Sequence, residues 1–172
     1  DWQPARGICG SGIIDIMASL LKAGVVNPAG RIKTPEQKED LQASVAEGLM
    51  LIDDQPVFNI ADSVYFSQAD IRQLQLAKGA IRTGIDMLMS EANVTAEDLE
   101  DITLAGAFGY HLRPDSLATI GLIPDKLARK VRFAGNTSKT GCAMMLIDAS
   151  LREYLEKQVQ CVEHLPLAEK IS

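Results

Sequence analysis

Three glycine-rich segments constrain the fold of this chain more than any other feature of its sequence. They read GICGSGIID at 7–15, LAGAFGYHLRP at 104–114 and AGNTSKTGCAMM at 134–145. The second and third follow apolar runs typical of strands, and the first and third lead into apolar runs with helical spacing. Glycine lets a ligand approach the backbone closely, and the free N–H groups at a helix start attract anions. Together the segments predict a nucleotide cleft, since ligands of parallel α/β sheets lie outside the carboxyl ends of the strands.

None of the three segments matches a standard phosphate-binding motif. Asp15 stands where a third glycine after Gly10 and Gly12 would complete G-x-G-x-x-G, and the glycines around Lys139 have the wrong spacing for a P-loop. Each segment alone also fits an ordinary tight turn between a strand and a helix. The prediction of a cleft therefore depends on all three occurring in one short chain.

Helical patterns occupy four parts of the sequence. One follows the first glycine segment and stops at Gly24, and a short one starts near Pro114, because proline suits the first helical position. A third, about 25 residues long, begins after Ser67, where Asp70 completes a capping box. Its apolar stripe consists of Ile71, Leu74, Ile81, Ile85, Leu88 and Ala92, interrupted by Gly79 and Gly84. The last helix is expected from Ser138 to about Gln158.

Short apolar runs predict strands at 48–52, 57–60, 101–106, 131–135 and 161–165. Helices and strands alternate in the second half of the chain, which predicts an α/β layered domain with parallel strands. The segment from 27 to 66 breaks this alternation, because it is polar and rich in turn residues before two strands that resemble a hairpin. It is interpreted as an insertion into the α/β core.

Gln75, Lys78 and Arg82 share one face of the long helix, because they lie three and seven residues apart. Polar and basic groups on that face could contact an adenine or a ribose. An ordinary solvated face explains the same pattern equally well.

Charge and composition exclude several classes of protein. The 172 residues carry a formal net charge of −6, which disfavours nucleic acid or an anionic membrane as a partner. No apolar run approaches the roughly 20 residues that span a bilayer. Cys9, Cys142 and Cys161 are far apart, as are the two histidines, so no disulfide framework or metal site is predicted, and free thiols suit a reducing cytoplasm.

Catalytic patterns are scarce. No serine has an evident neighbouring base, and no pair of carboxylates or zinc-protease motif occurs. Asp15 could reach Mg²⁺ through water or could face the positive end of a helix. The catalytic residues are therefore unassigned, and the sequence indicates binding rather than chemistry.

Four stretches resemble one known family. GICGSGIID, FSQADIRQLQLAKGAIRTGID, ITLAGAFG and GNTSKTGCAMML, in this order and spacing, resemble the carboxyl-terminal domain of the reductive activators of corrinoid proteins. That family belongs to the superfamily of acetate and sugar kinases, heat-shock chaperones and actin (ASKHA), and the resemblance extends from about Arg6 to Leu165. It implies a ribonuclease H-like, actin-like ATPase lobe with a mixed sheet, flanking helices and an inserted hairpin subdomain at 27–66. Residues 1–172 would then be one domain, the carboxyl-terminal half of an ASKHA ATPase domain and a fragment of a longer chain.

The resemblance also implies a set of nucleotide contacts for ATP with Mg²⁺. The LAGAFG stretch is similar to the superfamily's adenosine motif, which implies that Gly106, Ala107, Phe108 and Gly109 lie beside the nucleoside. Gln75, Lys78 and Arg82 would lie on the helix that flanks adenine, and Gly135, Asn136 and Gly141 would close the same side of the cleft. Gly10, Ser11 and Gly12 would approach the phosphates. Where the family has GNAAGTG this chain has GNTSKTG, and the phosphate-binding segments of the DIGTN kind are absent.

In function, the resemblance implies the nucleotide-binding lobe of an ATP-dependent activator that returns cob(II)alamin of a corrinoid protein to cob(I)alamin. The electron would come from a 2Fe–2S ferredoxin-like domain in an amino-terminal part that these residues lack, so the fragment alone is expected to be inactive. The expected partner is a corrinoid protein, self-association as a homodimer is left open, and the expected location is the cytoplasm. Two alternatives remain at this point, a non-catalytic docking or dimerisation module and a lobe of an ASKHA small-molecule kinase.

Overall fold

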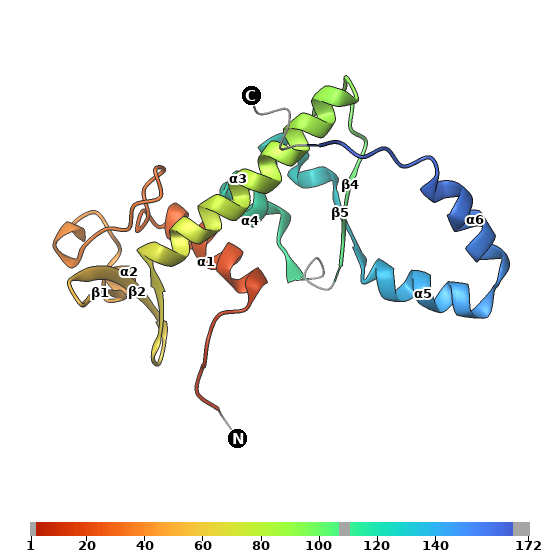
Figure 1. Ribbon diagram of the computed structural model, residues 1–172. Coiled ribbons are helices and arrows are strands. Elements are labelled where there is room, and N and C mark those ends of the chain that lie inside the picture. Colours follow the sequence, from red (N-terminus) through yellow and green to blue (C-terminus); the bar gives the residue numbers. More distant parts are fainter. Residues whose placement is uncertain (1–2, 107–110, 167–172) are drawn as a thin grey trace.

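A computed structural model describes residues 3–106 and 111–166 and divides them into two groups of elements (Figure 1). The first contains α1, a three-stranded sheet and the start of the long helix α3. The second contains the strands β4 and β5 and the helices α5 and α6, which project from β5 as an arm. The predicted α/β class is confirmed. The strands of the described residues form two separate sheets, one antiparallel and one parallel, instead of one mixed sheet.

Helix α1 (Gly10–Lys22) confirms the helix predicted after the first glycine segment. Met17, Ala18 and Leu20 on one face are buried. The helix ends before Gly24, whose φ of +73° lets the chain reverse at once. Val25 and Val26 then enter the core with exposed fractions of 0% and 1%.

The region 27–66, which is predicted to be an insertion and is called the inserted region below, contains three strands, one more than the predicted hairpin pair. A 3₁₀ turn (Pro35–Gln37) and the short helix α2 (Ala43–Ala46) precede β1 (Leu49–Ile52), β2 (Gln55–Ala61) and β3 (Val64–Ser67). The three strands form an antiparallel meander in the order β1-β2-β3. The turn before β3 is possible because Asp62 adopts a φ of +48°, a conformation that aspartate tolerates. Val64 and Phe66 then point into the core, which holds the third strand in place.

Helix α3 (Gln68–Glu91) starts as the sequence predicts. The Ser67 N–H donates to Asp70 Oδ2 at 2.8 Å, and the Asp70 N–H donates to Ser67 Oγ at 3.3 Å, which is the predicted capping box. Only the first turns of the apolar stripe are deeply buried, since Ile71 is fully covered while Ile81 is 50% and Leu88 57% exposed.

The second group is built on two parallel strands. Strand β4 (Ile102–Ala105) pairs with β5 (Val131–Gly135), and between them the chain forms α4 (Pro114–Thr119) and a 3₁₀ helix (Asp125–Lys130). The predicted parallel pairing and the helix start at Pro114 are confirmed. Leu117 and Leu127 anchor the connection, each with an exposed fraction of 1%.

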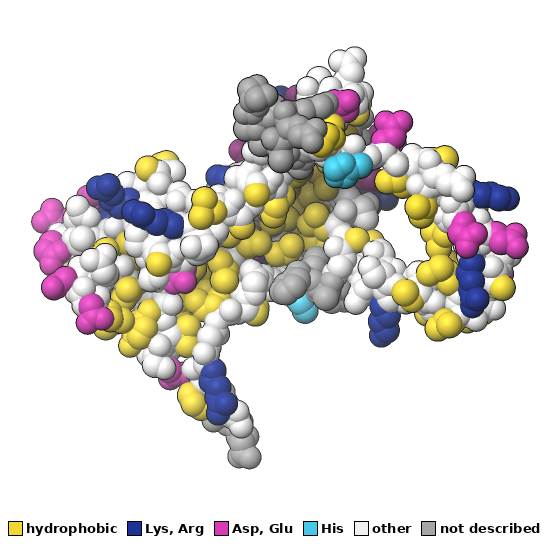
Figure 2. All heavy atoms as spheres, in the orientation of Figure 1, with side chains coloured by type: hydrophobic (Ala, Val, Ile, Leu, Met, Phe, Trp, Pro, Cys, Tyr) yellow, Lys and Arg dark blue, Asp and Glu magenta, His cyan; other side chains and the backbone are white. Residues whose placement is uncertain are grey.

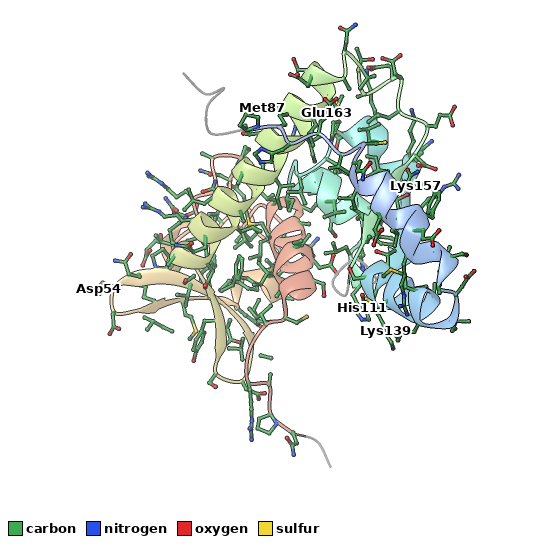
Figure 3. All side chains as sticks on the ribbon, turned by 45° about the vertical axis from the view of Figure 1, so that its right-hand side comes forward. Asp54, Met87, His111, Lys139, Lys157 and Glu163 are labelled. Atoms are coloured by element: carbon green, nitrogen blue, oxygen red, sulfur yellow. The ribbon has the colours of Figure 1, made fainter. Side chains whose placement is uncertain are left out.

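The expected last helix is broken in two, and the expected last strand is absent. Helix α5 (Thr137–Ile147) ends at Asp148, and α6 (Ser150–Val159) starts two residues later. The break occurs because Asp148 Oδ1 accepts hydrogen bonds from the Ser150 N–H at 2.9 Å and its hydroxyl at 2.7 Å. Residues 161–165 form no strand and pass back toward α3, where Glu163 lies near Met87 (Figures 1 and 3).

The core joins α1, the inserted region and the start of α3. Its buried members come from all three parts and from the residue after α4, namely Met17, Ala18, Leu20, Val25, Val26, Ile32, Leu49, Phe66, Ile71 and Ile120. The inserted region therefore packs as part of the main core. Over the described ranges, no helix is both long enough and apolar enough to span a membrane.

Candidate functional site

The candidate site lies where β4 and β5 end. Gly106 directly follows β4 and Gly135 is the last residue of β5, with φ values of +111° and +66°, and the Gly106 N–H donates to the Gly135 carbonyl at 2.8 Å. Among the described residues other than its own chain neighbours, a side-chain Cβ built at either glycine would meet no atom within 4 Å. The two glycines thus expose backbone to open space at the carboxyl ends of parallel strands, which is where such sheets bind ligands.

Helix α5 begins directly beside this pair of glycines. Asn136 is its N-cap, and its Oδ1 accepts a hydrogen bond from the Lys139 N–H at 3.1 Å. A Cβ at Gly141 would also meet nothing within 4 Å, and the first turn contains no acidic residue. The helix start therefore combines open space with the positive end of a helix dipole.

The start of α1 lies on the same side of the molecule as the carboxyl ends of β4 and β5 (Figure 1). Its N-cap, Cys9, makes no side-chain cap hydrogen bond, so Gly10, Ser11 and Gly12 open the helix without a capping side chain. The Ser11 hydroxyl, 3.4 Å from the thiol, and then the backbone of Gly12 lower the pKa of Cys9 below its ordinary value. These groups favour a negative charge at the helix start, as a phosphate site requires.

A polar contact ties α1 to the segment that follows the second glycine turn. The Ser116 hydroxyl donates to Asp15 Oδ1 at 2.6 Å, and Arg113 Nε lies 3.5 Å from Asp15 Oδ2. Ser116 is buried, with an exposed fraction of 7%. Asp15 therefore connects α1 to α4, and this contact fixes the first glycine segment relative to the chain after the second.

Gln75 and Lys78 line a cavity of about 410 Å³ between α1, α3, the 26–30 loop and the end of α4. The Gln75 Nε2 donates to the Ala29 carbonyl at 3.2 Å, so part of this side chain holds the inserted region to α3. The cavity is lined by Leu21 and Lys22, at the opposite end of α1 from Gly10. Arg82 pairs with Asp86 at 2.9 Å along the same helix. Contact of these three residues with a base stays a prediction.

The predicted residues thus fall into three sets. Gly106, Gly135, Asn136 and Gly141 lie together at the strand ends, and Gly10, Ser11 and Gly12 open α1 on the same side. Gln75 and Lys78 line their own cavity. Ala107, Phe108 and Gly109 lie outside the described residues. His111 after β4 and Lys139 in α5 lie near each other on one side of the molecule in Figure 3.

Sequence reasoning missed the role of Arg113 and Ser116. A serine two residues after Pro114 carries no distinct signal, because its partner Asp15 is 101 residues away in the chain. Cys9, Cys142 and Cys161 are free and exposed. Within 3–106 and 111–166, no three His, Cys, Asp or Glu side chains gather as metal ligands would.

Comparisons with known proteins identify the family of the chain. The family described as the C-terminal domain of RACo, the ASKHA domain, matches residues 1–172. The chain is 30% identical over 173 residues to a corrinoid activation enzyme, RamQ, of Eubacterium limosum, covering 95% of this chain and 29% of that protein. It is 25% identical over 146 residues to a Co(II) methylated amine-specific corrinoid protein reductase of Methanosarcina barkeri, covering 85% of this chain and 23% of that protein.

Among solved structures, the chain is similar to a reductive activator for a corrinoid, iron–sulfur protein. The two share 27% identity with a TM-score of 0.81, over 98% of this chain and 27% of that one. The chain therefore spans less than a third of the length of each of these relatives.

Proposed function

The chain belongs to the family of RACo C-terminal ASKHA domains, and from this premise we propose that it forms the nucleotide-binding lobe of an ATP-dependent reductive activator. In this proposal the complete protein returns cob(II)alamin of a corrinoid protein to cob(I)alamin. The names of two relatives, a corrinoid activation enzyme and a corrinoid protein reductase, support that assignment. They favour it over a small-molecule kinase or a pure docking module.

One observation carries the nucleotide-binding part of the proposal. Gly106 and Gly135 lie at the carboxyl ends of two parallel strands with positive φ and are hydrogen-bonded to each other, and among the described residues the space beside each Cβ position is open. An ordinary turn after a strand does not require that the neighbouring strand also end at a glycine with positive φ. A nucleoside can lie flat against such backbone, because no Cβ stands in its way.

The residues of this chain fit a nucleotide at several points. In the proposed arrangement the nucleoside lies against Gly106 and Gly135, beside Gly141. The phosphates, with Mg²⁺, lie toward the start of α1, where free N–H groups and the dipole favour negative charge. Ala107, Phe108 and Gly109 complete the nucleoside side by family resemblance. Asn136 contributes indirectly in this proposal, because its side chain caps α5 and holds the start of that helix in place.

Gln75, Lys78 and Arg82 remain the proposed contacts of the base. Gln75 and Lys78 line a cavity whose polar groups include Lys22 as well. This part of the proposal has its own test, because these residues lie on a different element from the glycine turns. A Lys78→Ala substitution is expected to weaken ATP and AMP binding by the same factor if Lys78 contacts the base.

The redox step belongs to the complete protein. In this proposal a reduced 2Fe–2S cluster held by another part of the complete protein would supply one electron, which would convert Co(II) to Co(I) in the corrinoid. ATP binding and hydrolysis supply a difference in free energy between two arrangements of the protein, and a ligand shifts such an equilibrium only by its differential affinity. We place the protein in the cytoplasm, where its three free, exposed cysteines would stay reduced.

Calorimetric titration of the full-length protein with ATP, ADP and AMP tests the nucleotide site. Gly106→Val blocks the nucleoside but also strains the backbone, so Gly141→Leu is the cleaner variant, because Gly141 lies in regular helix with open space at its Cβ. Ala43→Leu, at an exposed helical position in the inserted region, is the matched control. We expect Gly141→Leu to weaken all three nucleotides at least tenfold and Ala43→Leu to leave them unchanged. Equal affinities in both variants would contradict the site.

The activity is tested separately, by visible absorption of a cob(II)alamin-loaded corrinoid protein mixed with the reduced activator. Conversion to cob(I)alamin is expected only with ATP. Conversion that proceeds at the same rate without nucleotide would contradict ATP dependence and would leave the redox role standing.

A further inference from the structure

Three polar side chains connect the first half of α1 with the chain that follows the second glycine segment. Asp15 Oδ1 accepts a 2.6 Å hydrogen bond from the Ser116 hydroxyl, and Ser116 is buried. The other carboxylate oxygen of Asp15, Oδ2, lies 3.5 Å from Arg113 Nε. Because the buried serine holds one oxygen of Asp15 in place, the carboxylate offers Arg113 a fixed partner.

Arg113 uses only one edge of its guanidinium in this contact. Its side chain is 78% exposed, and the contact with Asp15 is made through Nε. Among the described residues, neither terminal amino group of Arg113 donates a hydrogen bond to the protein. A guanidinium that is held through Nε keeps these planar donors available for an oxyanion such as phosphate.

The Arg113 guanidinium lies beside the half of α1 that the proposed phosphate site uses. Ser11 and Asp15 are four residues apart, so they share one face of the helix. Helical side chains lean toward the amino-terminal end, which brings the Asp15 carboxylate over the preceding turn. Asp15 is itself about one and a half turns from Gly10. Arg113 therefore lies against the face of α1 that carries Ser11.

Positive charge is otherwise scarce in this part of the molecule. Helix α1 contains no lysine or arginine before Lys22, at its far end. On the face drawn in Figure 2, hydrophobic side chains line the central hollow, whereas the Lys and Arg side chains in view lie mostly around it. Arg113 is also the N-cap of α4, where a cation is unfavourable. A residue that breaks a local preference in this way is typical of a functional site.

We propose that Arg113 contacts the terminal phosphates of the bound nucleotide, and that Asp15 and Ser116 are positioning residues that hold its guanidinium toward them. This inference rests on the proposed nucleotide site and assigns the side chain that recognises its phosphate end. In that site the nucleoside lies at the ends of β4 and β5 and the phosphates extend toward α1. A group beside α1 therefore meets the β- and γ-phosphates before the α-phosphate. Asp15 does not repel them, because Arg113 and the Ser116 hydroxyl offset its charge.

An ion pair that serves stability alone is the other interpretation of Arg113, and Arg132 provides the matched case. Arg132 is 76% exposed, and its Nε lies 3.6 Å from Asp101 Oδ2. It is the second residue of β5, so it lies near the opposite end of that strand from Gly135. Exposed ion pairs of this kind contribute little to stability. The two arginines thus share exposure and type of partner and differ in their place relative to the site.

Calorimetric titration of the full-length protein with ATP and with AMP tests the inference. We expect Arg113→Gln to weaken ATP binding about tenfold and AMP binding less than about twofold, because a charged hydrogen bond to a terminal phosphate is lost. Arg132→Gln is expected to leave both affinities unchanged. Arg113→Lys keeps the charge without the planar donors and should weaken ATP about threefold. Ser116→Ala releases Asp15 and should also weaken ATP about threefold with AMP unchanged, which a purely structural role would not do.

The possible failures can be told apart. A wild type that binds ATP, with the same affinity in Arg113→Gln, contradicts the role of Arg113 and leaves the nucleotide site standing. Equal weakening of ATP and AMP in Arg113→Gln, or the same loss in Arg132→Gln, also overturns that role, because neither result singles out the terminal phosphates. An unchanged ATP affinity in Ser116→Ala overturns the positioning role of Ser116 and Asp15.

A wild type that binds none of the nucleotides overturns the nucleotide site and the role of Arg113 together. If Arg113→Gln fails to fold, Arg113→Lys decides in its place. Weaker ATP binding with unchanged AMP binding in Arg113→Lys supports the contact with the terminal phosphates, and an unchanged ATP affinity contradicts it.

Discussion

The two regions of this chain differ in where their stability comes from. The region of α1, the inserted sheet and the start of α3 has its own core, with Val25, Phe66 and Ile71 fully covered. The region of β5, α5 and α6 contains no buried residue among those described. The candidate nucleotide site lies at the start of the second region and at the beginning of α1. The comparison teaches that the site lies where an element with a core of its own, α1, meets elements whose described residues are not buried.

The sharpest test of this comparison replaces one phenylalanine in each region. Phe66→Ala removes a fully covered ring and is expected to cost about 3–5 kcal/mol of unfolding free energy. Phe133→Ala, on β5, removes a ring that is 37% exposed, and in the isolated 172 residues it should cost clearly less. Chemical denaturation measures both. Similar costs would mean that β5 belongs to the same core as Phe66, and the division into two regions would fail.

Backbone strain at the strand ends provides the next largest effect. Gly106→Ala places a side chain at a φ of +111°, which costs of order 1–3 kcal/mol. Gly141→Ala, at a helical position with open space, should instead stabilise the protein by up to about 1 kcal/mol. Denaturation midpoints of the two variants should therefore move in opposite directions. A neutral Gly106→Ala would show that the turn does not need this conformation.

The contact between Ser116 and Asp15 connects the two regions. Ser116→Ala removes a 2.6 Å hydrogen bond to the Asp15 carboxylate and is expected to cost about 1–2 kcal/mol. Ser19→Ala, on the same helix α1, removes an exposed hydroxyl that donates to the Asp15 carbonyl, and should change stability by no more than about 0.5 kcal/mol. Equal losses of unfolding free energy in the two variants would mean that the contact between Ser116 and Asp15 stabilises the protein no more than an exposed hydrogen bond does.

Local signals predicted the ends of individual elements in both regions. The capping box of Ser67 and Asp70 located the start of α3, and the glycine turns located the ends of β4 and β5. The third strand of the inserted sheet was missed, since a two-residue turn at Asp62 leaves little sequence signal. The break between α5 and α6 did leave a signal in the sequence, because Asp148 followed by Ser150 is typical of a helix start.

The remaining errors concern contacts between distant residues. Nothing near Ser116 in the sequence indicates that it meets Asp15. The run at 161–165 has the composition of a strand, but among the described residues no sheet edge receives it. The apolar stripe of α3 was predicted as one face, yet only its beginning meets the core, and Ile81 and Leu88 remain half exposed. Periodicity shows which face of a helix is apolar and does not show what covers it.

The smallest expected effect concerns Cys9 at the start of α1, and it reports on the phosphate side of the site. The Ser11 hydroxyl and then the Gly12 backbone lower the pKa of the Cys9 thiol, so near neutral pH more of it is thiolate than for an ordinary cysteine. Alkylation of Cys9 by iodoacetamide, followed by mass spectrometry, should therefore rise with pH earlier than for a free cysteine. Ser11→Ala removes the first cause and should shift this rise to higher pH.

The same alkylation of Cys9, repeated in the presence of ATP, tests whether phosphates bind at the start of α1. A phosphate bound at the start of α1 would compete with the thiolate for the same N–H groups and would place like charge beside it. Saturating ATP should then slow Cys9 alkylation in the full-length protein, with AMP slowing it less because it carries fewer phosphates. If ATP binds without changing the rate, the phosphates lie elsewhere, and the glycines at the ends of β4 and β5 would hold the nucleoside without help from α1. That outcome would leave the nucleotide site on the carboxyl ends of β4 and β5 alone.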